Sequence, residues 1–158
     1  MAEVQTLSRG TYDRLRAELE ELTGEGRIDI AHKIEAARAL GDLSENGDYH
    51  AAKEQQGKME ARIRQIMGTL QDAVVVDAGA ADTNSVVVGT VVTLRFEGDD
   101  DTERFLVGNI EERHDDAEVL SPGSPLGRAV MGASPGERRT YEVNGNQLGI
   151  EIVSIEPG

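Results

Sequence analysis

The sequence YHAAKEQQGKMEARIRQIMGTLQDA, residues 49–73, carries one long helical repeat. Its seam positions alternate at spacings of three and four residues and comprise Tyr49, Ala52, Gln56, Met59, Ile63, Ile66, Leu70 and Ala73. A seam kept for more than three heptads is typical of a helix that packs along a partner helix. At 1.5 Å per residue, a helix from Asp48 to Ala73 would be about 39 Å long.

A partner helix is predicted in the residues that come before this repeat. Leu7 and Ser8 have the form of a hydrophobic staple and an N-cap. An apolar stripe at helical spacing follows, over Tyr12, Leu15, Leu19 and Leu22. Ile30 resumes the stripe only after eight residues, so we expect an irregular turn or a kink between Gly24 and Gly26.

Residues 41–47, between the two helices, form a short segment with a glycine at each end. Such a connection favours an antiparallel hairpin, and a homodimeric coiled coil is the alternative. The turn of a hairpin lies at its far end. We therefore expect the side chains of the turn to be presented away from the rest of the protein.

After Asp77 the pattern changes to short β-branched runs that predict strands. The expected strands cover 86–88, 90–96, 105–107, 138–143 and 147–155. Asn144-Gly145 predicts a tight hairpin turn between the last two of them. Ser124 and Pro125 predict the N-cap and first residue of a short helix that ends near Met131.

The expected fold class is therefore α+β, with two parts joined by a linker. Residues 1–77 would form the antiparallel coiled-coil hairpin, with an acidic tip at 41–49. Residues 78–85 would be the linker, and residues 86–158 a small β-sheet domain with one short helix.

Composition narrows the class of protein. The chain has 158 residues, no cysteine, and 30 acidic against 16 basic side chains, for a net charge of −14. Disulfides and thiolate metal sites are excluded, and a general nucleic-acid binder would usually carry a basic face. The first residues do not resemble a signal peptide, and no apolar run is long enough to span a bilayer. We expect a cytoplasmic protein without a membrane partner.

The chemistry-bearing candidate is the predicted turn, where Asp42, Glu45 and Asp48 lie within seven residues. Mg²⁺ prefers oxygen ligands and keeps several waters, so one or two carboxylates suffice where another molecule supplies the other ligands. These acids would complete a metal site elsewhere and orient its water for attack on a phosphodiester. In the alternative interpretation, Asp42-x-x-Glu45 is a capping box that starts the second helix.

Charge is unevenly distributed along the chain. Residues 31–64 hold six basic and six acidic side chains, so the whole excess of −14 lies outside the tip half of the hairpin. Lys53 is a candidate phosphate contact there, although a solvated helix surface with pairs such as Glu54 and Lys58 explains the balance equally well. The stretch 97–118 has ten acids and two arginines, and we expect it to be a solvated surface.

Three motifs carry a resemblance to a known family. GDLSEN at 41–46 and YHAAKE at 49–54 closely resemble the tip of the GreA branch of the bacterial Gre transcript-cleavage factors. SPGSPLG at 121–127 resembles the stretch that opens the short helix of their C-terminal domain. The resemblance extends from about Leu7 to Pro157 in matching order.

This resemblance implies a coiled-coil hairpin followed by an FKBP-like domain, in a monomer that is not itself an enzyme. The C-terminal domain would dock at the rim of the RNA polymerase secondary channel, with Ser124, Pro125 and Leu126 in the docking region. The hairpin would reach the active centre and stimulate the polymerase's own cleavage of backtracked RNA.

The resemblance also implies roles for residues at the tip. Asp42 and Glu45 would help hold the second Mg²⁺ of the polymerase and activate water, without binding the ion alone. Ser44, Asn46 and Tyr49 would support the tip. Lys53 and Arg38 would belong to an RNA-contacting basic patch, and the protein would meet the 3′ end of the nascent RNA through the polymerase.

Two rival functions remain open. One is a channel-binding inhibitor of the same architecture, which would occupy the channel without promoting cleavage. The tip motif favours the activating branch. The other is a structural coiled-coil adaptor, which would be a dimer and have no polymerase partner.

Overall fold

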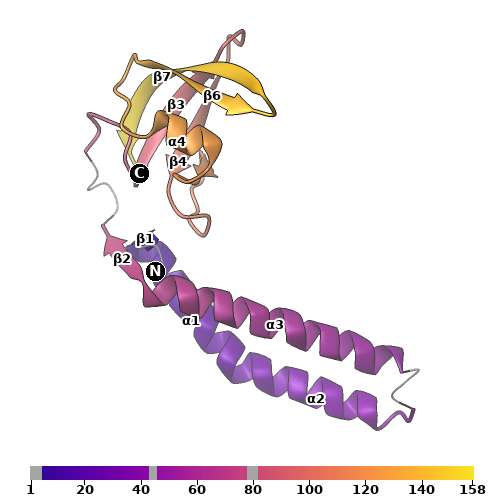
Figure 1. Ribbon diagram of the computed structural model, residues 1–158. Coiled ribbons are helices and arrows are strands. Elements are labelled where there is room, and N and C mark those ends of the chain that lie inside the picture. Colours follow the sequence, from indigo (N-terminus) through magenta and orange to yellow (C-terminus); the bar gives the residue numbers. More distant parts are fainter. Residues whose placement is uncertain (1–4, 43–45, 78–81) are drawn as a thin grey trace. The chain divides into compact units, whose positions relative to one another are not determined.

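The computed structural model describes residues 5–42, 46–77 and 82–158 (Figure 1). Contacts between Cα atoms divide the chain into two compact units. The first unit contains residues 12–72, and the second contains residues 5–11 and 73–158. The division of the chain into two domains joined at 78–85 stays a prediction.

Helices build the first unit. Helix α1 (Arg9–Glu21) begins in the second unit and continues through the π-helix η1 (Leu22–Gly26) into α2 (Arg27–Arg38). Helix α3 (Gly47–Gln71) lies beside α2 (Figure 1). The predicted pair of long helices is confirmed, and the partner for the seam of α3 lies in the same chain.

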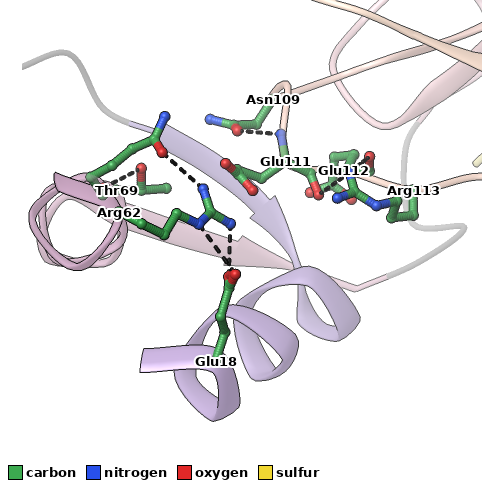
Figure 2. A network of polar contacts seen from close by, with 8 residues as sticks. Glu18, Arg62, Thr69, Asn109, Glu111, Glu112 and Arg113 are labelled. Atoms are coloured by element: carbon green, nitrogen blue, oxygen red, sulfur yellow. Dashed lines mark hydrogen bonds and ion pairs between the residues drawn. The ribbon is translucent and has the colours of Figure 1, made fainter. Parts of the chain in front are cut away.

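The hairpin has two helical arms, one formed by α1, η1 and α2 and the other by α3. Side-chain contacts show that these arms are antiparallel. As residue numbers rise in one arm they fall in the other, in the pairs Glu18 with Arg62, Arg27 with Glu60, Lys33 with Gln55, and Ala37 with Asn46. The guanidinium of Arg27 holds the pKa of the Glu60 carboxyl below its ordinary value, chiefly through their hydrogen bond. Arg62 makes a two-pronged contact with Glu18, at 2.7 and 3.2 Å, which Figure 2 draws.

The π-helix confirms the irregular turn expected at Gly24 to Gly26. A π-turn takes up an extra residue within a helix, which accounts for the eight-residue step from Leu22 to Ile30. The seam therefore continues, and Ile30 is buried, as are Ile63 and Ile66 of α3. A Cβ atom on Gly26 would lie 3.2 Å from the sulfur of Met59, so glycine lets the two arms approach closely there.

The seam of α3 ends earlier than predicted. The expectation that Ala73 closes the helix is wrong, because α3 ends at Gln71 and β2 (Ala73–Val76) follows. β2 pairs in parallel with β1 (Gln5–Ser8), with Gln5 opposite Ala73. The run of three valines in β2 suits this extended conformation better than a helix.

A five-stranded mixed sheet forms most of the second unit. Its strands are β3 (Thr90–Phe96), β4 (Thr102–Val107), β5 (Glu118–Leu120), β6 (Arg138–Val143) and β7 (Asn146–Pro157). The order is β5-β4-β3-β7-β6, with β4 and β5 parallel and the other neighbours antiparallel. Helix α4 (Pro125–Val130) packs on one face, where Val130 joins the buried core with Leu94, Val107 and Ile152.

The local turn and cap predictions are confirmed in this unit. Asn144 and Gly145 have φ of 52° and 83°, so both lie in the left-handed region that a tight hairpin turn requires. The side chain of Ser124 accepts a hydrogen bond from the N–H of Gly127, and Pro125 is the first helical residue.

The strand expected at 86–88 is wrong. These residues are not part of a strand, although the side chain of Val86 is fully buried in the core. The backbone of Val86 instead bonds to the segment after α4, donating to Ala133 and accepting from Gly132 at 2.9 and 2.8 Å. Val86 and Val88 thus contribute side chains to the core without joining the sheet.

Candidate functional site

The turn between α2 and α3 begins where the backbone of α2 leaves the helix. Leu40 and Gly41 donate to the carbonyls three residues before them, at 3.1 and 3.3 Å. Gly41 has a φ of 119°, in the region that favours glycine, so it ends the arm. Asp42 follows with an exposed side chain. Glu45 and Ser44, the other acid and one support residue expected at the tip, lie outside the described residues.

Asn46 begins the returning helix. Its Oδ1 accepts a hydrogen bond from the N–H of Tyr49 at 3.0 Å, so Asn46 is the N-cap of α3. The interpretation of Asp42-x-x-Glu45 as the capping box of this helix is therefore wrong. Aspartate, serine and asparagine are all good caps, and the residue next to the first helical turn takes the role.

Asn46 also joins the two arms. Its Nδ2 donates to the carbonyl oxygen of Ala37 at 2.5 Å, in the last turn of α2. One side chain thus holds the end of α2 and the start of α3 together and closes the loop that carries Asp42. This contact is consistent with the supporting role expected of Asn46.

Tyr49 makes a second connection between the arms. The guanidinium carbon of Arg38 lies 6.0 Å from the centre of the Tyr49 ring, within the range of a cation–π interaction. His50 meets the same ring edge to face, with centroids 5.7 Å apart. Of the two residues expected to contact RNA, Arg38 thus lies over Tyr49, and the Nζ of Lys53 donates to Gln56 at 3.0 Å. Both basic side chains are exposed.

Replacing Asn46 will show what its two contacts contribute. Asn46→Ala removes both the cap and the link between the arms, and we expect it to lower the local opening free energy at Tyr49 by about 2 kcal/mol. Asn46→Asp keeps an oxygen for the cap but loses the donor to Ala37, for a loss of about 1 kcal/mol. Amide hydrogen exchange of the Tyr49 N–H measures both values.

A matched control for Asn46 is the exposed Asn84. Only the backbone N–H of Asn84 takes part in its recorded hydrogen bond, to Asp82. We expect Asn84→Ala to leave exchange at Tyr49 unchanged. Wild-type exchange in Asn46→Asp would contradict a stabilising link between the arms.

The chemistry that the described tip offers is that of a hard oxygen ligand. Asp42 presents an exposed carboxylate on the loop, whereas the exposed carboxylate of Asp48 lies in the first turn of α3, where an acidic residue favours the helix. Among residues 5–42, 46–77 and 82–158, no group of three metal-ligating side chains stands close enough to hold an ion. The donor set of Asp42 fits one or two positions around Mg²⁺ whose other ligands come from elsewhere.

The residues expected to dock on the polymerase surround the start of α4. The hydroxyl of Ser124 donates to the carbonyl of Ser121 at 2.7 Å, in addition to capping the helix. Pro125 is exposed, whereas Leu126 packs partly against the core. Ser124 thus shapes the turn, and Pro125 offers the accessible surface.

One acidic side chain that sequence reasoning missed is Glu112. The expectation that the stretch 97–118 is a solvated surface is wrong at Glu111 and Glu112, which are 8% and 7% exposed. The carboxylate of Glu112 accepts three hydrogen bonds from Ser8 and Thr11, more than a hundred residues away in sequence. A partner at that distance leaves no local pattern that would have revealed it.

In a search for membrane-spanning helices, none in the described part of the chain was both long enough and apolar enough to cross a bilayer.

Comparisons with known proteins match this architecture over nearly the whole chain. Residues 5–75 match the family model "Transcription elongation factor, N-terminal", and residues 81–157 match "Transcription elongation factor, GreA/GreB, C-term". The transcription elongation factor GreA of Streptomyces avermitilis is 49% identical over 98% of this chain and 94% of its own length. That of Saccharopolyspora erythraea is 46% identical over 99% and 98%.

Among solved structures, the chain is similar to the crystal structure of the GreA factor homolog 1 protein of Thermus thermophilus. That likeness covers 98% of this chain and 99% of the other, at 22% identity and a TM-score of 0.46. The two family models and the identity to curated relatives carry the assignment. The chain belongs to the GreA/GreB family of transcription elongation factors.

Proposed function

We propose that this protein enters the secondary channel of bacterial RNA polymerase and stimulates the polymerase's own cleavage of backtracked RNA. Family membership supports a role in transcription elongation. The observation that carries the finer proposal is the exposed carboxylate of Asp42, placed on a loop whose two ends Asn46 joins. Removal of the backtracked 3′ segment would return an arrested complex to elongation in the bacterial cytoplasm.

Asp42 and Glu45 act in this proposal on a metal ion that the polymerase holds. Their carboxylates complete its coordination and help orient the attacking water. The Mg²⁺ would supply a nucleophile by lowering the pKa of that water and would stabilise charge on the phosphate. Because the chain contributes only part of the site, it is a cofactor of the polymerase rather than a nuclease.

The contacts at the tip support this role for the Asp42 carboxylate. The Asn46 link and the Arg38–Tyr49 contact both join α2 to α3, so two contacts hold together the helices from which the Asp42 loop leaves. A catalytic group must be held in a defined place to contribute fully to a reaction. Ser44 would add to this support, and Arg38 and Lys53 would provide positive charge near the RNA 3′ end.

Docking is assigned in this proposal to the second unit. Ser124, Pro125 and Leu126 would lie at the rim of the channel. The turn has a defined conformation because Ser124 bonds to Ser121 and to Gly127. The protein would act as a monomer, because the seam of α3 has its partner in the same chain.

A stalled complex tests the proposal directly. Polymerase is backtracked on a template with 5′-labelled RNA, and the protein is added with Mg²⁺. We expect the RNA to shorten from its 3′ end much faster than with polymerase alone, and to stay intact when the polymerase is omitted or Mg²⁺ is chelated. Binding without shortening would contradict the proposal and indicate a channel-binding inhibitor. A dimer without affinity for polymerase would indicate an adaptor.

A further inference from the structure

The N-terminus of α1 has half of a capping box. Ser8 precedes the helix, and its Oγ accepts a hydrogen bond from the N–H of Thr11 at 3.3 Å. In a complete box, a glutamate or glutamine at the third helical position accepts from the N–H of the cap residue. Here that position is Thr11, whose hydroxyl contacts the Ser8 hydroxyl and donates to Glu112 rather than accepting from the N–H of Ser8. The N–H of Ser8 therefore needs an acceptor from elsewhere.

Glu112 supplies that acceptor from the loop that follows β4. Its Oε2 accepts from the N–H of Ser8 at 2.9 Å, and its Oε1 accepts from the hydroxyls of Ser8 and Thr11 at 2.7 and 2.8 Å. A buried carboxylate is costly unless it is hydrogen-bonded, and the N-terminus of a helix favours negative charge. The Glu112 carboxylate accepts three hydrogen bonds, and it lies at the N-terminus of α1.

The loop around Glu112 is itself held by hydrogen bonds (Figure 2). The Oδ1 of Asn109 accepts from the N–H of Glu111 at 2.8 Å, and the Asn109 carbonyl accepts from the N–H of Glu112 at 2.9 Å. Arg113 donates to the carbonyls of Glu111 and Glu112 at 3.4 and 3.2 Å. The Nδ2 of Asn109 also donates to the side chain of Gln5, in β1.

We infer that Glu112 is a positioning residue for the proposed cleavage activity, because it completes the capping box of α1 from the loop after β4. The inference rests on the proposed function. Glu112 is not a ligand of the tip. It acts through Ser8 and Thr11, which fix the first turn of α1 within the second unit. Helix α1 continues from that turn into the first unit, so the cap sets the residue at which this helix begins.

Loss of the Glu112 contacts should lower the maximal rate of stimulated cleavage and leave the half-saturating concentration of the factor nearly unchanged. Glu112→Gln keeps the size of the side chain but has one acceptor oxygen where Glu112 has two. We expect the maximal rate of stimulated cleavage at saturating factor to fall about 10-fold, because small misplacements of a reacting group lower rates strongly. The concentration that gives half of that rate should stay within about twofold of the wild type, because the docking surface is unchanged.

A second pair of variants tests the same cap more gently. Thr11→Val removes one donor to Glu112 and keeps the shape of the side chain, whereas Thr11→Ser restores the hydroxyl. We expect a fall of about fivefold in the maximal rate for Thr11→Val and recovery for Thr11→Ser, since one hydrogen bond contributes about 1 kcal/mol. Glu118→Gln, at an exposed glutamate in the same unit, controls for loss of a negative charge.

Amide hydrogen exchange of Ser8 in the free protein gives a readout that does not involve polymerase. We expect about fivefold faster exchange in Glu112→Gln, as expected when an N–H loses a hydrogen bond that contributes about 1 kcal/mol. If the wild-type protein fails to stimulate cleavage, the proposed function fails, while faster exchange of Ser8 in Glu112→Gln would still demonstrate the cap.

If the wild type is active, an unchanged maximal rate in Glu112→Gln overturns the positioning role. A rise in the half-saturating concentration alone would also overturn it. Should Glu112→Gln fail to fold, equal rates for Thr11→Val and Thr11→Ser overturn it.

Discussion

Replacing Asp42 with asparagine will lower the rate of stimulated RNA cleavage by about 100-fold or more, with polymerase affinity within about twofold of the wild type. Asparagine preserves the size of the side chain but removes the charge that a hard cation prefers. Loss of a group that stabilises developing charge in a reaction typically costs factors of about 10² to 10³. Single-turnover cleavage of labelled RNA in a backtracked complex, at saturating factor, measures the effect. Glu45→Gln should behave in the same way.

Asp48 provides the matched control for this experiment. It lies six residues after Asp42 and has an exposed carboxylate in the first turn of α3, where acidic residues favour the helix. We expect Asp48→Asn to change the rate by less than about threefold, because its interaction with the helix dipole is worth about 0.5 kcal/mol. Undiminished cleavage by the double variant Asp42→Ala with Glu45→Ala would exclude the tip carboxylates from the mechanism.

Gly127→Ala will destabilise the second unit by about 3 kcal/mol or more. A Cβ atom at this buried position would lie 2.0 Å from the carbonyl oxygen of Ser121 and 3.0 Å from the Cα of Pro122. Both contacts involve backbone, so relief requires moving the turn that opens α4. Overpacking of this kind costs about 1–3 kcal/mol where side chains can adjust, and more where the backbone must move. Thermal unfolding should show a fall in Tm of roughly 10 °C or more.

Gly123→Ala is the control, because it adds the same methyl group to the same turn. Its new Cβ would be 3.8 Å from the Ser121 hydroxyl, an ordinary contact. We expect its free energy of unfolding to stay within about 0.5 kcal/mol of the wild type. Equal stability of the two variants would show that the approach of Gly127 to Ser121 does not constrain the turn.

The elements that could be predicted from sequence are those specified by neighbouring residues. Asn144-Gly145 predicts its own turn because few other residues adopt positive φ, and Ser124-Pro125 predicts a helix start through local capping. The π-turn was foreseeable from the eight-residue step between Leu22 and Ile30. The parallel pairing of β1 with β2 was not, because it joins segments 68 residues apart, as the register of Gln5 with Ala73 shows.

The features of the candidate site also divide into those that local sequence predicts and those that depend on distant contacts. The acid at position 42 and the glycine before it were visible in the sequence, and the structure places them at the end of α2 as expected. Which residue caps α3 was not decidable, because several good caps occur in a row. The bond from Asn46 to Ala37 and the burial of Glu112 depend on how distant segments meet. Tertiary contacts of that kind leave no trace in a local pattern.

The π-turn in the first arm also has a consequence for how the length of the hairpin can vary. Each residue added to a regular helix rotates everything beyond it by about 100° around the axis. One surplus residue would turn Ile30 and Ala37 away from α3, yet both remain buried. The wider turn at Leu22–Gly26 therefore takes up the rotation of the extra residue. The side chains beyond it keep facing α3 although the arm has one more residue. An arm built in this way can hold one more residue without turning its apolar face away from α3.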